Sequence, residues 1–150
     1  MTLITENSEV KRIIERFYKA FSTNDIALLR QVVTDDWEYI PALAGSMSGP
    51  EQMREVFGQI TAALPDMNIN LLDVLVHGDR VGVRAEVTGT QTGNLLGIAA
   101  TSKVIRFDIH SFHELRGSLV AKTWHLEDWL SIFRQLGELP PASSLLTDGM

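Results

Sequence analysis

The sequence of 150 residues contains no cysteine. That absence excludes disulfide bonds, a catalytic thiolate and cysteine-based metal sites. No apolar run approaches the roughly 18 residues that a membrane-spanning helix requires. Residues 1–7 are polar and acidic, which is unlike a secretory signal peptide. Together these features predict a cytoplasmic protein.

Basic side chains are also scarce. The 13 Lys and Arg residues are outnumbered by 19 Asp and Glu residues, so the formal net charge is −6. They are scattered along the chain, whereas a nucleic-acid-binding protein presents a clustered basic face. We therefore expect neither nucleic acid nor an acidic membrane surface as a partner. The hydrophobic fraction of 45% is that of an ordinary folded domain.

The first 65 residues carry apolar side chains at helical spacing, which predicts three helices. The longest apolar stripe comprises Val10, Ile13, Ile14, Phe17, Tyr18 and Phe21. A short second helix is expected from residue 26, with Asn24 as its N-cap. A third is expected to begin near residues 48–51 and to end at Pro65.

After residue 65 the period of the apolar pattern changes from 3.6 to 2 residues. Alternation over 81–87 and 105–109 predicts strands, and glycines at 78 and 117 predict hairpin turns. A last helix is expected over about 127–137. Helices followed by consecutive strands indicate an α+β fold, a cone-shaped α+β barrel in which helices close a curved antiparallel sheet around an apolar pocket. We expect one domain over 1–137 and a C-terminal tail over 138–150.

Several segments in this order match a known pattern. Residues 123–129 read Thr-Trp-His-Leu-Glu-Asp-Trp and are followed by Gln-Leu-Gly at 135–137, and Thr-Gly-Thr at 88–90 leads to Leu-Gly-Ile at 96–98. Over residues 8–137 the chain resembles the SnoaL-like polyketide cyclases, part of the nuclear-transport-factor-2-like superfamily. One departure occurs at 99–103, which read Ala-Ala-Thr-Ser-Lys where the family usually has Pro-Pro-Thr-Gly-Lys. We expect the change to loosen a loop at the pocket mouth.

The resemblance implies a polyketide (ester) cyclase-like enzyme that closes a ring by intramolecular aldol condensation, with one Asp and without metal or cofactor. Carried over by position, that residue is Asp128. An apolar setting would disfavour its charged form and make it a better base. The alternative is that Asp128 is only a helix N-cap, because it lies directly before a helical stripe.

The other candidate residues each have a structural alternative. His125 could orient Asp128 or share a proton with it, or it could be a surface histidine. His110 could donate to a substrate carbonyl if its strand face lines the cone, or it could face solvent. Trp124 is expected beside Asp128, and the pocket lining is expected to include Trp37, Tyr39 and Phe57, all of which could equally be ordinary core residues.

Other chemistries find less support. His110 and His113 are three apart in a strand and so point to opposite faces, which argues against a metal site. A serine hydrolase elbow, Gly-x-Ser-x-Gly, is absent. Two alternatives stay open: a non-catalytic small-molecule-binding domain, and an epoxide-hydrolase-like enzyme using Asp108, Arg84 and Asp128. Because few helices are available to cover the sheet, we also expect a homodimer through its uncovered face.

Overall fold

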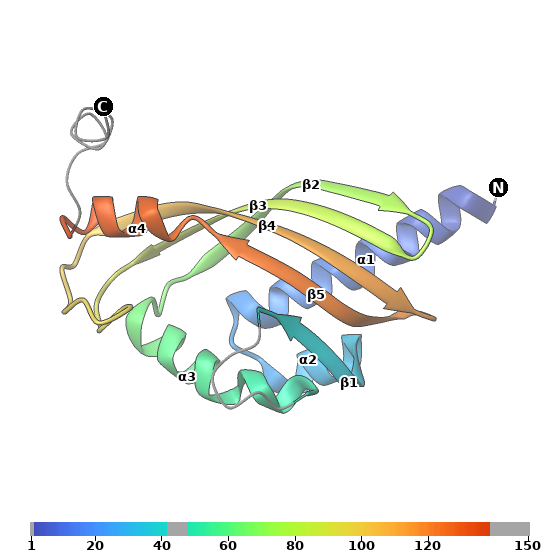
Figure 1. The fold of residues 1–150 in the computed structure, drawn as a ribbon, viewed down its shortest axis with the longest axis horizontal. Helices are drawn as coiled ribbons and strands as arrows, with labels where there is room; N and C mark the ends of the chain where they lie inside the picture. Colours follow the sequence, from blue (N-terminus) through green and yellow to red (C-terminus); the bar gives the residue numbers. More distant parts are fainter. Residues whose placement is uncertain (1, 42–47, 139–150) are drawn as a thin grey trace.

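The computed structural model describes residues 2–41 and 48–138. The described chain forms four α-helices, a short 3-10 helix and five strands (Figure 1). The helices are α1 (Thr2–Ser22), α2 (Ile26–Val32), η1 (Pro50–Met53), α3 (Arg54–Ala63) and α4 (Trp129–Gln135). The strands are β1 (Val33–Ile40), β2 (Asn68–His77), β3 (Arg80–Thr90), β4 (Val104–Arg116) and β5 (Leu119–Glu127). The expected tail, 138–150, lies outside the described residues except for Glu138.

The five strands form one sheet in the order β1-β5-β4-β3-β2. Strands β2 to β5 are consecutive antiparallel neighbours, and β1 pairs in parallel with β5. The sheet is therefore mixed, and it curls without closing on itself (Figure 1). The predicted α+β fold is confirmed, and β1 adds an edge strand that the sequence pattern did not indicate.

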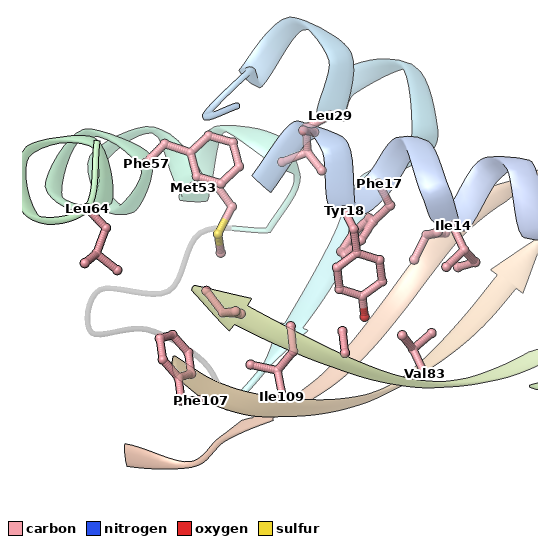
Figure 2. Close-up of a cluster of buried hydrophobic side chains, with 14 of the residues drawn as sticks. Ile14, Phe17, Tyr18, Leu29, Met53, Phe57, Leu64, Val83, Phe107 and Ile109 are labelled. Carbon is pink, nitrogen blue, oxygen red and sulfur yellow. The ribbon is translucent and has the colours of Figure 1, made fainter. Parts of the chain in front are cut away.

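The two faces of the sheet differ in burial. On β4 the side chains of one parity are buried and those of the other are exposed, in strict alternation from Ile105 to His113. The buried parity defines the inner face, which α1 covers. Ile14, Phe17 and Tyr18 extend from α1 toward Val83 and Ile109 on the sheet (Figure 2). Leu75, Phe112 and Leu126 on the opposite, outer face are exposed.

Local capping differs from the expectation at one position. Asp25, not Asn24, is the N-cap of α2, because its Oδ1 accepts a hydrogen bond from the Leu28 amide at 3.0 Å. Asn24 instead occupies the preceding turn with φ of 53°. At η1, Gly49 is the N-cap and Pro50 takes the first helical position. None of the helices in the described ranges is long and apolar enough to span a bilayer.

Candidate active site

Polar side chains occupy the middle of the inner face, where β4 and β5 run side by side. The antiparallel register places Ser111 opposite His125 and His113 opposite Thr123. Since inward side chains recur every second residue, Thr123, His125 and Glu127 share the inner face of β5. Ser111, His113 and Thr123 are buried, at 2%, 0% and 0% exposed. Buried polar groups of this kind are stable only when they are hydrogen-bonded to one another.

His125 is held at both ring nitrogens. Its Nδ1 lies 2.9 Å from the Ser111 hydroxyl, and its Nε2 lies 2.9 Å from Oε1 of Glu127. The ring of Tyr39 on β1 packs against the imidazole, with 5.5 Å between ring centroids. The imidazole is thereby fixed by groups from β1, β4 and β5.

Glu127 lies at the end of β5, where the inner face begins to open. Its side chain is 33% exposed, and its second carboxylate oxygen accepts a 2.7 Å hydrogen bond from the indole nitrogen of Trp129. Burial alone would raise the pKa of Glu127, but the hydrogen bond and the charge of His125, with the Trp129 hydrogen bond, lower it overall. The carboxylate is therefore kept ionised while part of it still reaches solvent.

A second set of hydrogen bonds continues the row into the core. The Tyr18 hydroxyl lies 2.9 Å from Nε2 of His113, and Nδ1 of His113 lies 2.9 Å from the Thr123 hydroxyl. The Trp37 indole donates to that same hydroxyl at 3.1 Å. This set lies next to His125, because Ser111 and His113 are two residues apart on the inner face of β4.

Burial sets the protonation of the inner groups. It raises the pKa of the Tyr18 phenol well above its ordinary value, against a smaller lowering by the Ser111 side chain. It lowers the pKa of His113 to about 3, helped by the nearby charge of His125. The pKa of Tyr39 is raised by burial and then by the charge of Glu127. Tyr18, Tyr39 and His113 are thus neutral near pH 7.

The row provides one side chain that can exchange a proton with a bound molecule. Both nitrogens of His125 are occupied by protein groups, and Ser111 is buried. Glu127 presents a carboxylate that is partly open and that receives donors from His125 and Trp129. An oriented carboxylate of this kind is suited to act as a general base and then as a general acid.

The structure brings only some of the sequence-predicted residues to this place. His125 lies at its centre and Tyr39 packs on it. Asp128 is exposed and is the N-cap of α4, with its Oδ1 accepting a 3.0 Å hydrogen bond from the Ser131 amide. Trp37 and Phe57 are core residues, 0% and 3% exposed, and Trp37 reaches the row only through Thr123.

His110 and Trp124 lie on the outer face instead. His110 is exposed and pairs with Arg84 and Leu126 on neighbouring strands. The Trp124 ring has the Arg80 guanidinium 5.5 Å and the Lys122 ammonium 5.4 Å from its centroid. Side chains alternate between the two faces of a strand. Trp124 therefore faces away from its neighbour His125, and His110 faces away from its neighbour Ser111.

Two residues of the epoxide-hydrolase alternative, Arg84 and Asp108, lie on the opposite face of the sheet from this row. Arg84 lies on the outer face and pairs with Asp73 at 2.7 Å. Asp108 is exposed on the same face of β4. Among residues 2–41 and 48–138, no three His, Asp or Glu side chains group as a metal site would require.

Glu127 was not among the predicted site residues, and Ser111, Thr123 and Tyr18 were not either. Strand alternation could have indicated Glu127, because it lies two residues after His125 and four after Thr123 and therefore on the same face of the strand. Asp128 was favoured because of its place before the final helix. The contacts of Tyr18 with His113, 95 residues apart, follow from tertiary packing alone.

The loop that departs from the family pattern is held by one buried amide. Gln91 is 0% exposed, and its Nε2 donates to the carbonyls of Ile98 and Ala99 at 2.9 and 3.2 Å. Its Oε1 accepts hydrogen bonds from the amide and the hydroxyl of Thr101. Ser102 has a φ of 59°, in the left-handed region where the family usually has glycine. The loop is therefore tied to the core despite the missing prolines.

Comparisons with known proteins agree with this architecture. The profile of the SnoaL-like polyketide cyclase family matches residues 11–136. No curated protein sequence matches the chain. TsrD from Streptomyces laurentii superposes with a TM-score of 0.80 at 26% identity, over 88% of this chain and 97% of TsrD.

Two further structures show how widely the fold is used. A Bacillus cereus protein proposed to be a polyketide cyclase has a TM-score of 0.75 at 26% identity, over 88% of this chain and 83% of that one. AclR from Streptomyces galilaeus, proposed to be a hydroxylase, has a TM-score of 0.79 at 17% identity, over 95% and 94% of the two chains. The second likeness shows the fold alone. Since the family profile spans most of the sequence, the chain belongs to the SnoaL-like polyketide cyclase family.

Proposed function

We propose that this chain is a cyclase-like enzyme that closes a ring in a flat, carbonyl-bearing small molecule by cofactor-free acid–base catalysis. The observation that carries the proposal is the carboxylate of Glu127, which is partly open to solvent and is oriented by His125 and Trp129. The family membership supports the class of reaction. The substrate would lie at the open end of the inner face, beside Tyr39 and Glu127.

The reaction requires one proton to leave and return. Glu127 takes a proton from a carbon between two carbonyl groups, and the electron pair of that C–H bond forms an enolate. The enolate carbon attacks a second carbonyl of the same molecule, which makes the C–C bond and leaves an alkoxide. Glu127 then returns the proton to that oxygen, so the product is an isomer of the substrate. General acid–base assistance of this kind contributes about 10²–10⁴ in rate.

His125 positions the base in this proposal. With a hydrogen on Nε2, its ring donates to Glu127 and keeps the carboxylate ionised between turnovers. A carboxylate with a lowered pKa is a weak base, so the substrate has to be an acidic one. A carbon flanked by two carbonyls meets this condition because the enolate charge is delocalised.

The adjacent carboxylates allow a matched test. The probe is an aromatic ketone with a 1,3-dicarbonyl side chain, and NMR in D₂O follows both deuterium entry at carbon and ring closure. Glu127→Gln, which keeps the size of the side chain and one oxygen that can accept from the Trp129 indole, should lower both rates by about 10² or more. Asp128→Asn should stay near wild type, because Asn caps a helix about as well as Asp.

The competing assignments give different results. Loss of activity in Asp128→Asn with retention in Glu127→Gln would return the base to Asp128, as the family resemblance implies. Saturable binding of the probe by the wild type, without deuterium entry, would identify a non-catalytic binding domain. Melting curves of both variants show whether a loss of rate is only a loss of fold.

We further propose that the working unit is a homodimer formed through the outer face. One row across the sheet runs Leu75, Gly82, Phe112, Trp124, and Phe112 covers the bare backbone of Gly82. Leu75 and Phe112 are 71% and 65% exposed. The charges around this row are already paired within the chain, as in Arg80–Glu114 and Arg84–Asp73. An apolar surface with self-paired charges suits a second copy of itself.

A further inference from the structure

The apolar side of α4 is covered along most of its length but not at its first residue. Trp129, Ile132, Phe133 and Leu136 recur at helical spacing and therefore share one side of this helix. Ile132 and Leu136 are 2% and 5% exposed, and Phe133 packs against the buried cluster, whereas Trp129 is 50% exposed. Trp129 thus lies on the side of α4 that meets the core, but the described part of the chain leaves half of its surface uncovered.

The edge of the same indole holds the carboxylate of the proposed base. Its Nε1–H donates to Oε2 of Glu127 at 2.7 Å, while Nε2 of His125 lies 2.9 Å from Oε1. An indole N–H bond lies in the plane of the ring, so Glu127 is bound at the edge of Trp129 and not over its face. The face of the indole can therefore contact a second group while the hydrogen bond at its edge is kept.

The partly exposed Trp124 provides a contrast within the same chain. Its ring lies on the outer face and has Arg80 and Lys122 5.5 and 5.4 Å from its centroid, so the protein's own cations already pack on it. The ring contacts in the described part of the chain include no cation and no aromatic ring on Trp129. The indole beside Glu127 therefore has a face available to a bound molecule.

A flat ring on this face would bring its substituents to the carboxylate. Stacked aromatic rings lie about 3.5–4 Å apart and prefer an offset arrangement, in which the second ring extends past the edge of the first. A ring offset toward the Nε1 edge of Trp129 therefore brings a carbon attached to it close to Oε2 of Glu127. This is the carbon from which the proposed base has to take a proton.

We infer that Trp129 binds the aromatic part of the substrate by stacking and at the same time orients Glu127 through its N–H. This inference rests on the proposed function and narrows the substrate to molecules that carry an aromatic ring next to the acidic carbon. Trp129 is then a specificity-determining residue, because an equally acidic molecule without the ring loses the contact that places its carbon at the base. Recognition of the ring and orientation of the carboxylate depend on one side chain.

The test compares two probes that differ in one ring. Benzoylacetone carries a phenyl group beside its dicarbonyl unit, and its cyclohexyl analogue carries a saturated ring of similar size. Titrations followed by NMR of the indole N–H groups read the three tryptophans separately and give dissociation constants. The wild type should bind benzoylacetone about five- to tenfold more tightly than the analogue. Benzoylacetone alone should shift the Trp129 indole proton upfield, because a stacked aromatic ring produces a ring current.

Two variants separate the two roles of Trp129. Trp129→Phe keeps an aromatic face, so the dissociation constant of benzoylacetone should stay within about twofold of wild type. Its rate of deuterium entry should fall by about tenfold or more, because the hydrogen bond to the carboxylate is lost. Trp129→Leu loses the face as well, so the preference for benzoylacetone over the cyclohexyl analogue should disappear. Trp124→Phe on the outer face is the control and should keep both the preference and the rate.

The stacking role is overturned if the wild type binds the two probes equally or not at all, or if the preference survives in Trp129→Leu. A preference lost in Trp124→Phe would place the ring on the outer face and overturn it too. The upfield shift in the wild type needs no variant, so the test does not depend on one that fails to fold.

Binding is measured without turnover, which separates this inference from the proposed function. A preference that is lost in Trp129→Leu, together with full deuterium entry in Glu127→Gln, would leave the stacking role standing and remove the proposed function. Equal binding of the two probes, together with loss of deuterium entry in Glu127→Gln, would do the opposite.

Discussion

Acidification should weaken the fold through His113. This imidazole is 0% exposed and its pKa in the folded protein is lowered to about 3 by burial. In the unfolded chain the same group has an ordinary pKa of about 6.5. Protons therefore bind the unfolded state first. The stability that follows from keeping His113 neutral is complete above pH 6.5 and is lost progressively as the pH falls toward 3.

The magnitude follows from the difference between the two pKa values. Each pH unit below the unfolded pKa removes about 1.4 kcal/mol until the folded pKa is reached. Between pH 7.5 and 4.5 the free energy of unfolding should therefore fall by about 2–3 kcal/mol through this one group. Other groups, including Glu127 with its lowered pKa, add their own dependence.

Urea unfolding of wild type and His113→Asn at pH 7.5, 6.0 and 4.5 isolates the contribution. The variant has an offset at all pH values from its lost Tyr18 hydrogen bond, but it lacks the titrating imidazole. The difference in unfolding free energy between the two proteins should thus change by about 2–3 kcal/mol across the range. The control variant is His110→Asn, on the exposed face of the same strand. It should leave the pH dependence of the unfolding free energy close to that of the wild type.

Equal pH dependence in wild type and His113→Asn would refute this reasoning. It would mean either that His113 is protonated in the folded state with a partner, or that water reaches it. Nitrogen-15 NMR of the histidine rings is a direct check, because a charge on His113 in the folded protein at pH 5 would be visible in its ring nitrogen shifts.

Three further predictions follow from the loop and the outer face. Ser102→Gly should raise the free energy of unfolding by about 1 kcal/mol, because glycine adopts φ of 59° without the strain of a side chain; urea unfolding measures this. Gln91→Leu should lower it by about 2–4 kcal/mol, because four hydrogen bonds that hold the 98–101 loop are lost; an unchanged midpoint would contradict the assignment. Phe112→Lys should convert a dimer into a monomer in light scattering with little change in helix content, whereas a wild type that is already monomeric at micromolar concentration contradicts the proposed interface.

The sequence predicted the fold best where a local pattern decides the structure. The apolar stripe of α1 and the alternation in β3 and β4 correspond to real elements. Strand β1 was missed because residues 33–40 include two adjacent aspartates and gain their strand character from pairing with β5. In β2 a register shift between Leu71 and Asp73 interrupts the alternation. Both cases depend on partners that a local window does not contain.

The candidate site was likewise predictable only in part. Strand parity alone places Ser111 and His113 on the face of Ile105, Phe107 and Ile109, and this could be predicted from the sequence. The choice between Glu127 and Asp128 could not be predicted, because it depends on where β5 ends and α4 begins. That boundary is set by the hydrogen bond from the Asp128 amide to the Asp108 carbonyl and by the cap on Ser131.

The buried row is itself an argument for a chemical role. The inner face of β4 is apolar from Ile105 to Ile109, becomes polar at Ser111 and His113, and is apolar again at Leu115. Burying a hydroxyl or imidazole is unfavourable unless every hydrogen bond is made, and well-packed apolar residues would stabilise a core at least as well. Here His113 is paired with Tyr18 and Thr123, and Ser111 is paired with His125, whose other ring nitrogen meets the partly open carboxylate of Glu127. A core that needed only stability would have no reason to place a buried hydroxyl against a histidine that orients an open carboxylate, whereas a site that uses Glu127 as a base needs such a partner to fix the imidazole.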